Sequence, residues 1–172
     1  DAFVTPGSGG LNGATSAVFG PDGNLYHSSS ASNSVLRYNG TTGAFIDTFI
    51  APGSGGLIGP QDLVFGPDGN LYVNSFTTDS VLRYNGTTGA FIDAFVPTGS
   101  GGLDGTTDLL FHTDGNLYVT SGFNDRVLRY NGTTGVFIDT FVSAGSGGLS
   151  VPEYMTFGPD GNLYVCTHFN NT

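Results

Sequence analysis

The feature that most constrains the fold of this chain is a sequence that returns every 46 residues. The segment Phe19–Tyr26 reads Phe-Gly-Pro-Asp-Gly-Asn-Leu-Tyr, and close copies of it occur at 65–72, 111–118 and 157–164. No insertion or deletion separates the copies. A fixed period in this range is typical of stacked supersecondary units. The chain of 172 residues therefore contains about 3.7 repeats.

Each repeat predicts four short β-strands. In the second copy these are 62–65, 71–76, 81–84 and 91–96, all rich in β-branched and aromatic residues and without a helical period. The turn sequences Pro-Asp-Gly-Asn, Thr-Thr-Asp and Asn-Gly-Thr-Thr-Gly separate them. Four-stranded antiparallel units repeated head to tail predict an all-β fold, a β-propeller of four-stranded blades. The alternative, a β-solenoid, usually has shorter coils.

We predict a single propeller, or propeller segment, over residues 1–172. Its parts are a partial outer strand over 1–4, blade 1 over 5–50, blade 2 over 51–96, blade 3 over 97–142 and an incomplete blade 4 over 143–172. The first four residues match 47–50, and the last residue precedes an expected third strand. We therefore expect a larger ring, completed by further repeats of the same polypeptide or by an identical chain.

Charge and hydropathy argue against two classes of partner. The net charge is −10, and the four basic residues are all arginine. Such a surface repels phosphate backbones and anionic lipid, so we expect no nucleic acid partner. No apolar run reaches the roughly 18 residues of a membrane-spanning helix, so no membrane insertion is expected. Acidic, lysine-free repeats rich in Gly, Ser, Thr and Asn suggest an extracellular or cell-surface setting.

The repeat resembles a known family. Phe-Gly-Pro-Asp-Gly-Asn-Leu-Tyr-Val, then Ser-Val-Leu-Arg-Tyr and the Asn-Gly-Thr-Thr-Gly hairpin, is similar to NHL-type propeller repeats and to streptogramin-lyase-like and gluconolactonase-like propellers. The resemblance extends to all four copies. It implies a propeller, typically six-bladed, from a group that includes protein- or RNA-binding modules, lyases and metal-dependent lactonases. Such a fold does not by itself select a function.

Two departures from the family pattern bear on activity. The family often has an aspartate shortly after the second strand's Tyr-Val, where this chain has Ser29, Ser75, Ser121 and Thr167. Its enzymes carry histidines or acidic metal ligands near the start of the innermost strand, and none of the matching residues here is histidine. Both departures argue against lyase chemistry.

Polar residues at the start of each innermost strand are the best candidates for a binding site, because these positions line a propeller's central channel. They are Thr15, Ser16, Gln61, Asp62, Thr107, Asp108, Glu153 and Tyr154. The carboxylates of Asp62, Asp108 and Glu153 could together hold a hard cation such as Ca²⁺. The alternative is a solvated channel mouth without a ligand. No other cofactor is expected.

The loop between the second and third strands differs most among the copies. It carries the aromatic residues Phe76, Phe123 and Phe169. Variable loops on a rigid scaffold commonly carry function, so we expect an interaction rim there for a protein or glycan ligand.

Other recurring residues predict structural roles. Asp68 should cap its own turn, and Arg83 should pair across strands with Asp93. The Gly-Ser-Gly-Gly segments should be flexible connectors between blades. The acceptor pattern for N-glycosylation occurs at Asn39, Asn85, Asn131 and Asn170, but hairpin chemistry explains the first three. The three histidines, His27, His112 and His168, occupy unrelated repeat positions, which favours surface or strand-end roles.

The near-identity of the copies predicts a non-enzymatic binding or self-assembly scaffold, because a catalytic site needs different residues in different blades. The alternative is a metal-dependent lactonase-like or lyase-like enzyme whose site in the central channel uses Asp62, Asp108 and Glu153.

Overall fold

The computed structural model describes residues 2–168, which form three four-stranded antiparallel sheets and one two-stranded sheet. Blade 1 contains β1 (Ala14–Phe19), β2 (Leu25–Ser29), β3 (Ser34–Tyr38) and β4 (Phe45–Ile50). Blade 2 contains β5 (Leu63–Phe65), β6 (Leu71–Ser75), β7 (Ser80–Tyr84) and β8 (Phe91–Val96). Blade 3 contains β9 (Leu109–Phe111), β10 (Asn116–Ser121), β11 (Arg126–Asn131) and β12 (Phe137–Val142). Blade 4 contains β13 (Pro152–Phe157) and β14 (Leu163–Thr167).

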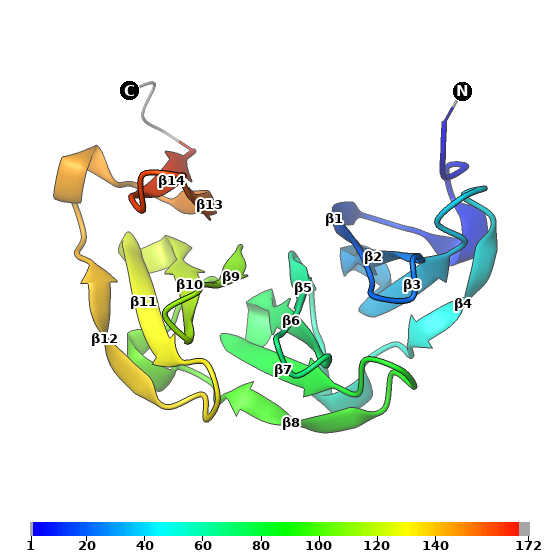
Figure 1. Cartoon of the computed structure of the whole chain (residues 1–172), viewed down its shortest axis with the longest axis horizontal. Coiled ribbons are helices and arrows are strands. Elements are labelled where there is room, and N and C mark those ends of the chain that lie inside the picture. Colours follow the sequence, from blue (N-terminus) through cyan, green and yellow to red (C-terminus); the bar gives the residue numbers. More distant parts are fainter. Residues whose placement is uncertain (1, 169–172) are drawn as a thin grey trace.

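The blades follow one another around an open arc, with the first strand of each blade inside and the fourth strand outside (Figure 1). This arrangement confirms the predicted all-β propeller architecture. Residues 2–4 do not form the partial strand expected over residues 1–4. Val4 instead packs against Leu25, Leu36 and Tyr38 of blade 1.

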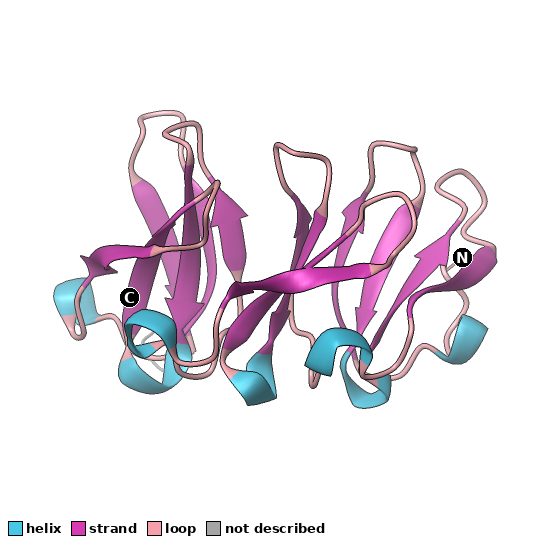
Figure 2. Cartoon of the chain, turned by 90° about the horizontal axis from the view of Figure 1, so that it is seen from below, coloured by secondary structure: helices cyan, strands magenta, loops and turns pink. Residues whose placement is uncertain are grey.

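The Gly-Ser-Gly-Gly connectors are ordered turns, and the expectation that they are flexible is wrong. They form the short 3₁₀ turns η1 (Ser8–Gly10), η3 (Ser54–Gly56), η5 (Ser100–Gly102) and η7 (Ser146–Gly148). The Tyr84 hydroxyl donates to the carbonyl of Ser54 at 2.7 Å, and equivalent tyrosines hold η1 and η5. All the 3₁₀ turns gather along one edge of the arc (Figure 2).

The hydrophobic core lies between the blades. Tyr72, which is 1% exposed, makes edge-to-face contacts with Phe95 of its own blade at 4.9 Å and with Phe111 of the next blade at 4.8 Å. The same three-ring arrangement recurs around Tyr26 and Tyr118. Aromatic pairs in this geometry stabilise by about 0.5–1.5 kcal/mol beyond the area that they bury. Each blade therefore needs its neighbour to bury the apolar face of its sheet.

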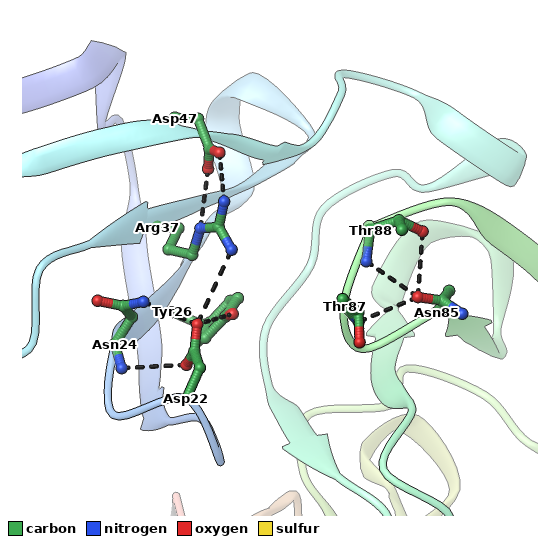
Figure 3. A network of polar contacts seen from close by, with 8 residues as sticks. All are labelled: Asp22, Asn24, Tyr26, Arg37, Asp47, Asn85, Thr87 and Thr88. Atoms are coloured by element: carbon green, nitrogen blue, oxygen red, sulfur yellow. Dashed lines mark hydrogen bonds and ion pairs between the residues drawn. The ribbon is translucent and has the colours of Figure 1, made fainter.

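A polar network in each of blades 1–3 orients this tyrosine, and Figure 3 shows that of blade 1. Arg37 donates from Nε and Nη2 to the two carboxylate oxygens of Asp47, at 3.1 and 2.5 Å, which confirms the predicted cross-strand pair. Asp22 accepts hydrogen bonds from the Asn24 backbone and the Tyr26 hydroxyl, both at 3.0 Å. Burial raises the pKa of Asp22, but hydrogen bonds from the Asn24 side chain and backbone and from Tyr26, together with the charge of Arg37, outweigh it and lower the pKa.

The outer hairpins are held by their asparagine. Oδ1 of Asn85 accepts from the backbone of Thr87 and Thr88, at 3.0 and 2.9 Å, and from the Thr88 hydroxyl (Figure 3). These bonds confirm that turn chemistry accounts for the Asn-Gly-Thr sequence. Asn170 lies outside the described residues.

Two glycines in one connector allow a prediction about stability in which one variant serves as the control for the other. Gly55 and Gly53 both have positive φ, at 65° and 71°, but a Cβ on Gly55 would lie 2.1 Å from the ring of Phe91, whereas Gly53 has no neighbour within 4 Å. Gly53→Ala should cost about 1–2 kcal/mol for backbone strain alone. Gly55→Ala should cost a further 1–3 kcal/mol or so for overpacking, measured by urea unfolding. Equal losses in the two variants would mean that the ring does not hold the turn.

Candidate functional site on the channel face

In blades 1–3, a polar side chain from the second strand holds the start of the first strand. Oδ1 of Asn74 accepts from the backbone of Gln61 and Asp62 at 2.8 and 2.7 Å, and Thr120 and Ser28 serve the same purpose in blades 3 and 1. All three side chains belong to fully buried residues. The residue at this position differs among the three blades but is small and polar in each of them. It was not predicted to take part in the site.

Two of the predicted channel carboxylates tie successive blades together. Asp62 accepts from the Ser16 hydroxyl of blade 1 at 2.5 Å and from the backbone of Leu109 in blade 3 at 3.2 Å. Asp108 accepts from the backbone of Met155 in blade 4 at 2.7 Å. Both side chains therefore serve as links along the inner side of the arc, where the first strands lie (Figure 1).

Asp108 lies in a low-polarity environment next to Asp62. Burial, followed by a hydrogen bond with the Asp62 carboxyl group and the charge of that group, raises the pKa of Asp108 well above its usual range. Two neighbouring carboxylates of which one is desolvated favour a shared proton. We interpret the pair as a neutral acid donating to a carboxylate at neutral pH.

The predicted Ca²⁺ ligands do not form a metal site. Across residues 2–168, no group of three or more His, Cys, Asp or Glu side chains is arranged to hold a metal ion. The oxygens of Asp62 and Asp108 are engaged by the blade links, and Glu153 pairs with a histidine instead. The proposed set of Asp62, Asp108 and Glu153 is therefore wrong as a ligand cluster.

Blade 4 brings Glu153 together with His168. Nδ1 of His168 lies 2.7 Å from Oε1 of Glu153. The two residues meet because Pro152 of β13 pairs with Thr167 of β14, so the residues beside them lie at the same end of the sheet. The side chains are 53% and 38% exposed, so solvent reaches both. His168 was not predicted as a site residue, and the strand register is the signal that could have found it.

The neighbouring channel residues complete a small hollow. Gln61, Thr107, Glu153 and Tyr154 line a cavity of about 60 Å³. Thr107 also donates to the carbonyl of Pro152 at 2.8 Å, and Thr15 donates to that of Pro60 at 3.0 Å, so these hydroxyls link blades. The structure therefore brings four of the eight predicted channel residues to one hollow.

The predicted rim is partly formed. Phe76 and Phe123 meet edge to face across two blades at 5.4 Å, and Phe123 remains 66% exposed. Phe169 lies outside the described residues. The other histidines have local partners: His112 stacks on Phe157 at 3.8 Å, and Nδ1 of His27 lies 3.0 Å from the carbonyl of Ser28.

The carboxyl pair generates a pH prediction. Because the folded-state pKa of Asp108 is raised, the folded chain binds this proton more tightly than the unfolded chain does. Its contribution to stability is fully present below the unfolded pKa of about 4 and is lost as the pH rises from there through the folded pKa. Within that interval, each step of one in pH removes at most about 1.4 kcal/mol.

Asp108→Asn imitates the protonated acid, since its amide can donate to Asp62 and accept from Met155. Urea unfolding between pH 5 and 9, at about half-unit steps, should show the variant gaining stability relative to the unmodified protein as the pH rises. A constant difference across that range would contradict proton sharing.

The comparisons with known proteins agree with this fold. No family model and no curated protein matches the chain. Virginiamycin B lyase from Staphylococcus aureus is 18% identical, with a TM-score of 0.69 over 94% of this chain and 50% of that chain. Hydrazine synthase from Kuenenia stuttgartiensis is 18% identical, with a TM-score of 0.74 over 98% and 46%. A putative gluconolactonase is 21% identical, with a TM-score of 0.69 over 95% and 58%.

At these identities the similarity concerns the fold, and the chain spans about half the length of the structures that it matches. Within residues 2–168, no helix is long and apolar enough to cross a membrane. The fold predicted from the repeat, that of the streptogramin-lyase-like and gluconolactonase-like propellers, is the fold that the chain adopts.

Proposed function

We propose that the channel face of this propeller acts as a general-base site for ring opening of cyclic esters, in the manner of a lyase or a lactonase. The observation that carries this proposal is the exposed Glu153–His168 pair at 2.7 Å beside a polar hollow. A histidine oriented by a carboxylate is a common general base near neutral pH.

The geometry assigns a role to each member of the pair. When Nδ1 of His168 donates to Glu153, Nε2 becomes the basic nitrogen, and the carboxylate stabilises the imidazolium that forms after proton transfer. Gln61, Thr107 and Tyr154 line the same hollow and supply amide and hydroxyl groups for polar atoms of a substrate. The described residues do not fit a divalent metal, so no step is assigned to one.

One base can serve either reaction. In a lyase, it takes a proton from carbon, the electron pair becomes a double bond, and the ring oxygen leaves with the electrons of the broken C–O bond. In a lactonase, it takes a proton from water, the hydroxide adds to the carbonyl carbon, and the ring C–O bond breaks. The imidazolium then returns its proton to the departing oxygen.

The similar folds support this choice. Lyase, lactonase and gluconolactonase occur among the names of the similar structures. One of those structures is described as a catalytically inactive histidine-to-alanine variant of virginiamycin B lyase with quinupristin. A histidine is thus essential in that protein, and in this chain His168 pairs with Glu153, which lines the hollow.

A binding scaffold is the second candidate, and the exposed ring of Phe123 on the rim favours it. A protein or glycan ligand could stack on this aromatic surface without any chemistry. For either function we propose an extracellular or cell-surface setting, on the basis of the acidic, lysine-free composition.

The proposed base predicts a specific loss of activity. With quinupristin and gluconolactone as substrates, His168→Asn and Glu153→Gln should each lower kcat/KM by about 100-fold or more. Asp104→Asn removes an exposed carboxylate away from the hollow and should leave the rate nearly unchanged.

Two outcomes would count against the assignment. Unchanged rates in both variants would show that another group is the base. Failure of the unmodified protein to open either ring would favour the binding scaffold.

A further inference from the structure

We propose that the open face of blade 4 binds the open face of blade 1 of a second copy of this chain, so that two copies form a closed propeller. This inference is independent of the proposed chemistry. It rests on two complementary defects, which are exposed aromatic rings at the two ends of the arc. The equivalent rings are packed against each other in the interfaces between neighbouring blades.

The first defect is at Tyr164 in blade 4. Its equivalents Tyr26, Tyr72 and Tyr118 are 1–2% exposed, whereas Tyr164 is 55% exposed. The local support is the same, because the Tyr164 hydroxyl still donates to Asp160 at 2.9 Å. What differs is that the described part of blade 4 has two strands and no following blade, so Tyr164 lacks both the phenylalanine of a fourth strand and the phenylalanine of a next blade. Tyr164 is therefore oriented for aromatic partners that residues 2–168 do not supply.

The second defect is at Phe19 in blade 1. Its equivalents Phe65, Phe111 and Phe157 contact the tyrosine of the preceding blade at 5.0, 4.8 and 5.0 Å. Phe19 is 60% exposed. If blade 1 of a second copy followed blade 4 as each blade follows the one before it, Phe19 of that copy would contact Tyr164. This is the edge-to-face contact that Phe65, Phe111 and Phe157 make with the tyrosine of the preceding blade.

The surfaces around these two rings also correspond. Tyr164, Met155 and Cys166 contribute to a hollow of about 160 Å³ with a mostly apolar lining. On blade 1, Ala14 and Ala17 are exposed, although the equivalents of Ala17 are buried leucines and a methionine. An exposed patch of this kind is typical of a surface that is covered in the assembled protein.

Two copies of the chain together have about the length of similar propeller structures. The chain spans 50% of virginiamycin B lyase and 46% of hydrazine synthase, so two copies approach the length of those structures. The arc has its two open faces at its two ends (Figure 1). Two arcs related by a two-fold axis would meet at both ends, and each would contribute one Glu153–His168 pair to a shared channel.

The repeat indicates a specific crosslink. Asn74 donates to the carbonyl of Thr106 in the next blade at 3.3 Å. Cys166 occupies the Asn74 position of blade 4, and Ala14 occupies the Thr106 position of blade 1. Cys166 of one copy should therefore lie beside Ala14 of the other, and Cys166 is the cysteine naturally present in the sequence.

The test combines mass with crosslinking. Light scattering of the 172-residue chain should give twice its mass of 17.7 kDa. Mild oxidation of Ala14→Cys should produce a covalent dimer with two crosslinks, whereas Ala90→Cys, which is exposed on an outer hairpin, should crosslink far less. Tyr164→Asp should give a monomer with unchanged circular dichroism.

Several results would overturn the proposal. A monomer at tens of micromolar with equal crosslinking in the two cysteine variants would show that the faces do not bind each other. Masses above two copies would indicate an open chain of arcs. If additional repeats of a longer polypeptide cover blade 4, that polypeptide would be monomeric, and a thiol reagent would not reach Cys166.

Discussion

The whole structure depends on an aromatic contact between neighbouring blades. A single four-stranded sheet exposes two apolar faces and cannot bury either by itself. In blades 1–3 the tyrosine of the second strand solves this by lying between a phenylalanine of its own blade and one of the next, as Tyr72 does with Phe95 and Phe111. Because the contact is repeated at a fixed period, the arc forms by adding identical interfaces.

Polar links set the angle at which these interfaces join. On the inner side, Asp62 and Asp108 accept backbone hydrogen bonds from the following blade. In the turns between the second and third strands, Asn33, Asp79 and Asp125 adopt positive φ and also accept from the following blade's backbone. The carboxylates of Asp62 and Asp108 at the channel face are therefore engaged in links between blades. Glu153 differs because its partner is a histidine side chain that can carry a proton.

Local features could be predicted from the sequence, and contacts across blades could not. The turn at Asp68 and the pair of Arg83 with Asp93 involve residues close in the chain, and the 46-residue period aligns them. The bond from Met155 to Asp108 spans 47 residues and depends on how far the blades rotate. The same reason explains why the three carboxylates were expected to converge and do not. His168 was missed because its pairing with Glu153 depends on the register between β13 and β14.

The central claim is that burial of the tyrosine ring between blades, rather than its hydroxyl bond to the turn, holds the arc together. Urea unfolding of two variants at one position tests it most directly. Tyr72→Phe removes only the hydroxyl bond to Asp68 and should cost about 1 kcal/mol, whereas Tyr72→Ala removes the ring and should cost about 3–5 kcal/mol. Equal losses in the two variants would contradict the account and assign the stability to the polar network.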